Sequence, residues 1–150
     1  MRLIGALALG VLAVGLAGAG HAPEPPPFAV GLPPGFTTRV SEGPDFTVWY
    51  FEKGGKAFAG AYAGNFPQFP VKTGADREPV GPYQQTVVCA GSEVKRRDIL
   101  LVLKQDFPRL IHAWTVDLPA ADRASAEAIL TSIHTAGNPG VPASALQRCG

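Results

Sequence analysis

The sequence predicts an α+β domain in which a largely antiparallel β-sheet carries a C-terminal helix packed on one face. Two observations support this prediction: strand-like segments come first along the chain, and the one strong helical pattern follows them. The chain has 150 residues, of which 46% are apolar and 17% charged, and it shows no internal repeat. This size and composition are those of a single globular domain, so we expect one hydrophobic core.

The clearest strand pair is the segment DFTVWYFEKGGKAFAGAYAG, which alternates in character on both sides of Gly54-Gly55. Two glycines accept the positive φ angles of a two-residue type I′ turn, so they predict a β-hairpin and set its register. The cross-strand pairs expected from this turn are Lys53–Lys56, Phe51–Phe58, Trp49–Gly60 and Thr47–Tyr62. In this register Trp49 covers the bare backbone of Gly60.

The two-residue period of a strand divides this hairpin into two faces. The aromatic face is expected to carry Trp49, Phe51, Phe58 and Tyr62. The opposite face is expected to carry a row of alanines together with larger side chains: Ala57, Ala59, Ala61 and Ala63 with Phe46, Val48 and Tyr50. Because alanines leave room for a close approach, we expect the helix to dock on the alanine face.

The helix is predicted in DLPAADRASAEAILTSIHTAGNPG, with Pro119 in its first turn and Gly137 at its end. Its apolar positions follow the i, i+3, i+4, i+7 pattern: Ala126, Ile129, Leu130 and Ile133. Further strands are expected at residues 36–40, 84–89, 98–104 and 110–116. The segment DILLVLK is apolar on both faces, which favours a central strand. The preceding VKRRD is interpreted as a solvated turn.

The N-terminus has the pattern of a secretory signal peptide, with Arg2 before an apolar stretch and an A-x-A site that ends at Ala19. The alternative is an uncleaved anchor, for which the apolar stretch falls short of the roughly 20 residues of a spanning helix. The resulting division is a signal peptide at 1–19, a proline-rich arm at 20–35, the domain at 36–136 and a Gly/Pro-rich tail at 137–150. We therefore expect a periplasmic or secreted protein that meets a membrane only through this peptide before cleavage.

The chain contains two cysteines, Cys89 and Cys149. Two cysteines in an oxidising compartment are expected to pair, and this disulfide would tie the tail to the domain. The alternative makes Cys89 a nucleophile served by His112 and Asp117.

Charge and motifs exclude several classes of function. The chain has 13 Lys and Arg against 12 Asp and Glu, a balance that offers no electrostatic basis for binding nucleic acid. It has no G-x-S-x-G, H-E-x-x-H, Walker or C-x-x-C motif, so no cofactor and no metal are expected. Of the three histidines, His112 is the one expected to lie where a side chain can face a pocket. Because it is a lone histidine beside Trp114 on a strand, we expect it to be a hydrogen-bonded structural residue.

The segment from Asn65 to Tyr83 has neither a strand nor a helix period, and loops of this length inside a compact domain are usually functional or disordered. Its rings at Phe66 and Phe69 are expected to lie across the aromatic face. They form a fixed lid that completes the core, a lid over a pocket for a small apolar or aromatic ligand, or a partner-binding patch. The candidate binding residues are Trp49, Phe51, Phe58, Tyr62, Phe66, Phe69, His112 and Trp114.

The segment LPPGFTTRVSEGPDFTVWYF, the hairpin turn at Gly54-Gly55 and the closing helix with AEAILTSI resemble the pattern of small PsbP-like domains. These domains are antiparallel sheets flanked by helices, and the resemblance spans roughly residues 32–134. It implies a non-enzymatic assembly or binding role. It assigns no functional residue, because no ligand motif of the family maps onto this chain.

Two functions follow as hypotheses. The first is a periplasmic or secreted, non-catalytic module that binds a small apolar ligand or a protein partner at the aromatic face and the Asn65 to Tyr83 loop. The second is a small exported, hydrolase-like enzyme that uses His112 with Cys89 or Asp117.

Overall fold

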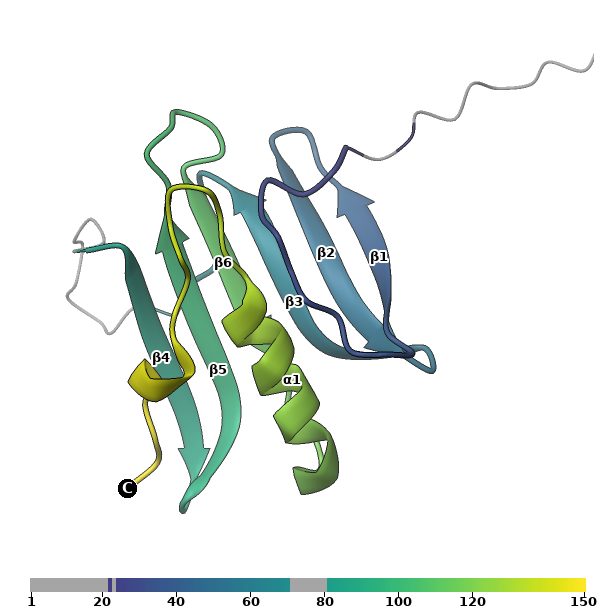
Figure 1. Cartoon of the computed structure of the whole chain (residues 1–150), viewed down its shortest axis with the longest axis vertical. Coiled ribbons are helices and arrows are strands. Elements are labelled where there is room, and N and C mark those ends of the chain that lie inside the picture. The colour runs from purple at the N-terminus through teal and green to yellow at the C-terminus, as the bar shows by residue number, and fades with distance from the viewer. Residues whose placement is uncertain (1–21, 23, 71–80) are drawn as a thin grey trace, which may run out of the picture.

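A six-stranded antiparallel sheet with one α-helix on one face forms the fold of the part of the chain that the structure describes (Figure 1). The structure is a computed structural model that describes residues 22, 24–70 and 81–150, so the predicted signal peptide lies outside the described residues. The strands are β1 (Thr37–Glu42), β2 (Phe46–Lys53), β3 (Lys56–Gly64), β4 (Tyr83–Ala90), β5 (Glu93–Val102) and β6 (Leu110–Thr115). They are followed by helix α1 (Ala120–Ser132) and a short 3₁₀ helix, η1 (Ala143–Ala145). The predicted α+β class is confirmed.

The strands lie in the order β1-β2-β3-β6-β5-β4, and every neighbouring pair is antiparallel. Strands β1 to β3 and β4 to β6 therefore form two consecutive meanders, which join where β3 pairs with β6. Strand β5, which contains most of the segment that is apolar on both faces, lies inside the sheet, as predicted. It begins at Glu93, before the predicted start, so the interpretation of VKRRD as a solvated turn is wrong: Arg97 and Asp98 are both buried.

The predicted turn at Gly54-Gly55 is confirmed, with φ of 58° and 75° and Lys53 opposite Lys56. The other three predicted pairs are wrong because Phe58 is an extra residue, a β-bulge, between the partners of Phe51 and Glu52. The observed pairs are Phe51–Ala59, Trp49–Ala61 and Thr47–Ala63.

This one-residue shift changes which side chains share a face, because side chains alternate along a strand. Trp49 and Phe51 pack on the same side as the alanine row, in a core that includes Ile129 and Leu130 of α1. Phe58 packs against Ala126 of α1 and its neighbour Leu118. The helix does dock on the alanines, as predicted, but three residues of the predicted aromatic face lie beneath it.

Gly60 is covered by Trp114 of β6 and not by Trp49, which corrects a second prediction. A Cβ atom at Gly60 would lie 2.5 Å from Cζ2 of Trp114, so the indole rests directly on the backbone of β3. Only glycine leaves space for this contact.

Described residues of both the predicted arm and the predicted tail pack against the domain. Phe28, within the predicted arm, is buried with its ring 5.1 Å from that of Trp49, and Ala29 forms a β-bridge with His134. In the predicted tail, Asn138 is buried and donates hydrogen bonds to two backbone carbonyls, and Val141 joins the core. The helix ends at Ser132, ahead of the predicted stop.

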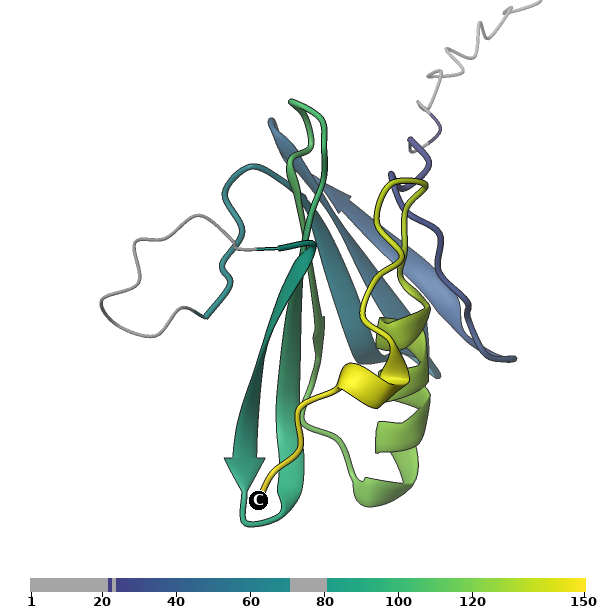
Figure 2. The same ribbon diagram turned by 60° about the vertical axis from the view of Figure 1, so that its left-hand side comes forward.

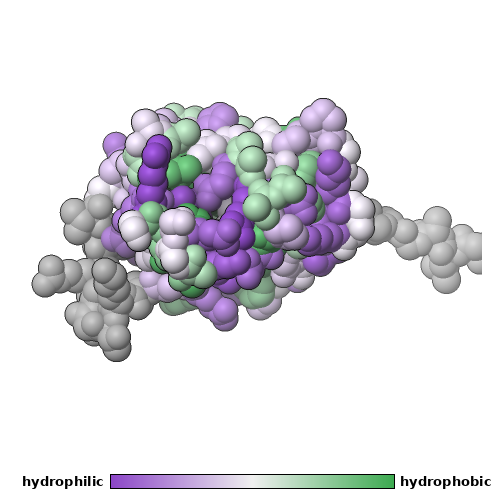
Figure 3. Space-filling model, turned by 90° about the horizontal axis from the view of Figure 1, so that it is seen from below, coloured by the Kyte–Doolittle hydropathy of each residue, from purple (hydrophilic) through white to green (hydrophobic). Residues whose placement is uncertain are grey.

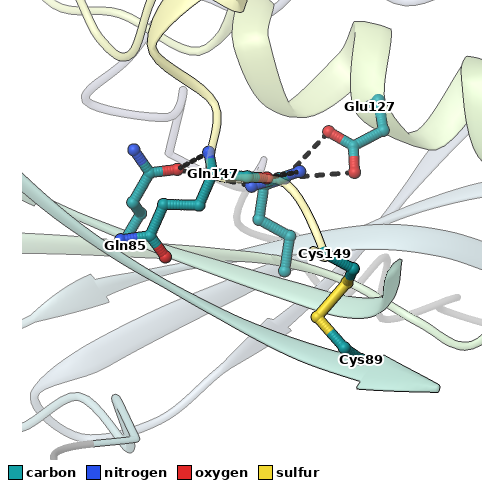
Figure 4. The surroundings of a disulfide bond; sticks show 6 residues. Gln85, Cys89, Glu127, Gln147 and Cys149 are labelled. Carbon is teal, nitrogen blue, oxygen red and sulfur yellow. Dashed lines mark hydrogen bonds and ion pairs between the residues drawn. A yellow bond between two sulfur atoms is a disulfide. The ribbon is translucent and has the colours of Figure 1, made fainter. Parts of the chain in front are cut away.

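The disulfide between Cys89 and Cys149 is present, as predicted (Figure 4). It ties the last residues of the chain to β4, which is an edge strand. Beside it, Arg97 forms an ion pair with Glu127 of α1 at 2.9 Å and donates from Nη2 to the carbonyl of Gln147 at 2.9 Å. The C-terminal segment is therefore held by one covalent link and by a buried guanidinium.

Candidate functional site

The face of the sheet that α1 leaves free, termed the open face, carries the candidate site. Figure 2 shows α1 on one side of the sheet and the segment that follows β3 on the other. The strand register brings Val48, Tyr62 and His112 into one row across β2, β3 and β6, and Tyr50, Trp114 and Asp98 into the adjacent row. Side chains from four strands therefore meet on the open face.

A cavity of about 540 Å³ lies over these rows, and we call it the open-face cavity. Its lining residues are Asp45, Phe46, Val48, Tyr50, Tyr62, Phe66, Gln68, Arg96, His112 and Trp114. Its volume falls within the range of small-molecule sites, about 300–1,000 Å³, and its mixture of rings with a few polar groups is typical of them.

A charged cluster forms the floor of the cavity. Asp98, with 0% of its side chain exposed, accepts hydrogen bonds from Nε of Arg96 at 2.8 Å and from Nη2 of Arg96 at 2.7 Å. Nε2 of His112 lies 2.8 Å from Oδ1 of the same carboxylate, and the imidazole is 4% exposed. Spacing within β5 places Arg96 and Asp98 on one face, and pairing with β6 adds the histidine.

The electrostatics of this cluster keep the carboxylate ionised. Burial is the largest single influence on the pKa of Asp98 and raises it, but the hydrogen bonds and charges of Arg96 and His112 together outweigh burial and hold that pKa below its usual value. The hydrogen bond to Asp98 also raises the pKa of Arg96. The Arg96–Asp98 ion pair therefore persists at neutral pH.

The walls of the cavity are aromatic. The rings of Tyr50 and Trp114 meet edge to face with centroids 6.4 Å apart, and those of Phe46 and Tyr62 stack at 5.6 Å. The hydroxyl of Tyr62 accepts a hydrogen bond from the backbone N–H of Phe66 at 3.1 Å, so its own proton is free to be donated.

The segment after β3 passes over this face. Phe69 packs its ring against His112 with centroids 5.6 Å apart, whereas Phe66 is 79% exposed at the rim of the cavity. Phe66 therefore does not complete a core, although Phe69 does cover a buried residue. The remainder of the predicted lid, residues 71–80, lies outside the described residues.

Some of the predicted binding residues come together and others do not. Those that line the open-face cavity are Tyr62, Phe66, His112 and Trp114, and Phe69 contacts His112. Those buried on the helix side are Trp49, Phe51 and Phe58. Sequence reasoning missed Arg96 and Asp98, although their two-residue spacing next to an apolar strand indicates a shared face.

The residues of the enzymatic hypothesis are not assembled as expected. Cys89 is in the disulfide and has no thiol to act as a nucleophile. Asp117 lies 3.7 Å from Lys95, and the carboxylate that pairs with His112 is Asp98. No group of three or more metal-ligating side chains occurs among the described residues.

Two further hollows lack a buried charged cluster. One of about 690 Å³ lies between the N-terminal segment and β2, and its acidic residues, Glu24, Glu42 and Asp45, are all exposed. The other, of about 210 Å³, lies beside the start of α1. The end of the molecule seen in Figure 3 shows hydrophilic and hydrophobic residues interspersed, without one extended apolar surface.

No protein-family model, no curated protein and no solved structure matches this chain, so the PsbP-like resemblance stays a prediction. Within residues 22, 24–70 and 81–150, no helix is long and apolar enough to cross a membrane.

Proposed function

We propose that this protein is an exported, non-catalytic binding module whose small aromatic or apolar ligand occupies the open-face cavity. One observation supports this most directly: the buried, ionised carboxylate of Asp98, paired with the partly exposed Arg96 and with His112, lies at the base of an aromatic cavity. Burying charges costs several kcal/mol of desolvation per ion, which apolar residues at the same positions would avoid. Ionisable groups with perturbed pKa values in a cleft are candidate functional sites.

The shape of the site favours a small molecule over a protein partner. Its lining side chains come from β2, β3, β5 and β6 and from the segment after β3, and they border a hollow of about 540 Å³, which is the size of a small-molecule site. Export is supported by the disulfide, since such bonds persist in oxidising compartments, and by the signal-peptide pattern at residues 1–19.

The test is binding of N-phenyl-1-naphthylamine, an uncharged aromatic probe whose fluorescence rises in apolar sites. We expect saturable binding by the processed protein, and about tenfold weaker binding by Trp114→Ala because one ring contact is lost. Phe66→Ala and Phe107→Ala form a matched pair, since both rings are exposed and each precedes a proline, but only Phe66 lines the cavity. Phe66→Ala should weaken binding and Phe107→Ala should not. Equal effects of the two changes, or no binding by the unmodified protein, would contradict the proposal.

A hydrolase-like enzyme is the second candidate, favoured by the hydrogen bond between His112 and Asp98 beside the cavity. A carboxylate that orients an imidazole is a recurring arrangement in general-base catalysis. Hydrolysis of 4-nitrophenyl acetate tests it, with His134→Ala as the control for a surface imidazole. Loss of turnover in His112→Ala alone would favour the enzyme, and equal turnover in the two variants would exclude it.

A further inference from the structure

We propose that the ligand of the open-face cavity is an aromatic acid, whose carboxylate binds the free edge of the Arg96 guanidinium. This inference rests on the proposed function, because it names the chemical class of ligand for the same cavity. It uses three features of the site: the donor groups that Arg96 has left over, the aromatic walls, and the distribution of charge along the cavity.

The geometry of Arg96 leaves one edge of its guanidinium available. A guanidinium has five N–H donors arranged in a planar fork. Asp98 occupies the side edge, where Nε and Nη2 donate to its two oxygens. The hydrogen bonds of Arg96 to described residues involve Nε and Nη2 only, so the end edge formed by Nη1 and the second Nη2 proton is open. This edge matches a carboxylate in a two-bond geometry.

The site holds that edge in place before a ligand arrives. Asp98 is wholly buried and also accepts from His112, so it fixes the guanidinium and shares its negative charge between two donors. The side chain of Arg96 is 43% exposed and lines the cavity. A ligand therefore meets an oriented pair of donors. Because the side chain of Arg96 is already held in place, ligand binding costs little of its conformational entropy.

An acid is favoured over an amine at the Arg96 end of the cavity, where the negative charge of Asp98 is already engaged by Arg96 and His112. Among the described residues, Asp45 is the other lining residue with a carboxylate or guanidinium charge, and it is exposed in the turn before β2. The strand order separates β2 from β5 by two strands, so Asp45 and Arg96 lie at opposite ends of the lining. Water screens the exposed carboxylate, whereas the partly buried guanidinium is screened less. The rings of Phe46, Tyr62 and Trp114, which also line the cavity, provide apolar surface for the aromatic ring of the ligand.

Calorimetric titration at pH 7 with three probes of the same ring system tests the inference: 2-naphthoate, 2-naphthol and 2-naphthylmethylamine. We expect 2-naphthoate to bind at least about tenfold more tightly than 2-naphthol, because hydrogen bonds between charged groups are stronger than those between neutral groups. The amine should bind most weakly.

Substitutions at one position and its neighbour locate the effect. Arg96→Gln should abolish the preference for naphthoate over naphthol. Because this change leaves Asp98 without its ion pair and can unfold the protein, Arg96→Lys is the second variant: it keeps the charge, loses the two-bond edge, and should reduce the preference severalfold. Lys95→Gln is the matched control, since it removes one charge from the adjacent residue, whose side chain lies beside the start of α1 and outside the open-face cavity.

The outcomes separate the two proposals. Equal binding of naphthoate and naphthol, tighter binding of the amine, or an equal effect of Lys95→Gln would overturn the inference and leave the binding module standing. Failure of all three probes to bind would overturn the binding module as well.

Discussion

Arg96 and Arg97 are neighbours on β5, yet their side chains serve opposite faces of the sheet. Arg97, with 4% of its side chain exposed, joins β5 to α1 and to the C-terminal segment through Glu127 and the carbonyl of Gln147. Arg96 pairs with a buried carboxylate and lines a cavity. The covered face uses its arginine to hold segments together, whereas the arginine of the open face lines the open-face cavity.

The same contrast holds for the aromatic residues. On the covered face the rings of Phe28 and Trp49 pack edge to face and are buried. On the open face Tyr50, Tyr62 and Trp114 are only partly buried and border the cavity. Burial organises the covered face, and the partly buried rings that border the cavity are the basis for the ligand site that we propose on the open face.

The largest effect should come from the centre of the covered face. Phe51→Ala should lower the free energy of unfolding by about 3–5 kcal/mol, because it removes a fully buried ring and leaves a cavity. Urea unfolding followed by circular dichroism measures this. A loss under about 1 kcal/mol would mean that the covered face is not the principal core.

Removal of the disulfide should have the next largest effect. The Cys89→Ser/Cys149→Ser double variant removes a covalent link between residues that are 60 positions apart in the sequence. Its free energy of unfolding should be lower by about 2–4 kcal/mol. If the double variant unfolds at the same urea concentration as the unmodified protein, the hydrogen bonds around Arg97 hold the C-terminal segment by themselves. The unmodified protein with and without a reducing agent serves as the control.

Because of the charged cluster on the open face, the free energy of unfolding should depend on pH in the acidic range. The folded-state pKa of Asp98 is lowered, so its contribution is complete above the unfolded-state pKa of about 3.9 and is lost as pH falls through the folded value. Unfolding free energies measured from pH 7 down to pH 2 should therefore decline below about pH 4. Asp98→Asn should be about 1–3 kcal/mol less stable at pH 7 and should show a shallower decline. Parallel curves for the two proteins would exclude Asp98 as the cause.

The smallest effect on stability should come from the rim of the cavity. Phe66→Ala should change the free energy of unfolding by less than about 0.5 kcal/mol, because its ring is exposed, while it weakens probe binding. Thermal unfolding and probe titration on the same preparation measure both quantities. A large decrease in the free energy of unfolding would mean that Phe66 is part of the hydrophobic core and not of the cavity rim.

Much of the fold was predictable because its signals are local. Gly54-Gly55 takes the positive φ angles that the turn requires, the spacing of Ala126, Ile129 and Leu130 defines the buried side of α1, and two cysteines allow one intramolecular pair. The alternation in β6 places His112 and Trp114 on one face and Ile111 and Ala113 on the other. Two of the eight predicted binding residues, His112 and Trp114, reach the open face by this alternation.

The site itself was decided by tertiary structure. The bulge at Phe58 shifts the pairing of β2 with β3 by one residue, so that Trp49 and Phe51 share the covered face with the alanine row. The Asp98–His112 contact exists because β5 and β6 are neighbours in register, and the cavity joins them to Tyr62 because β6 also pairs with β3. The amino-acid pattern by itself determined the strands, the turn, the helix and the disulfide, since each arises from short-range spacing or from counting. Strand order and register combine residues far apart in the chain, so only the assembled sheet could decide which side chains share a face and which charges meet.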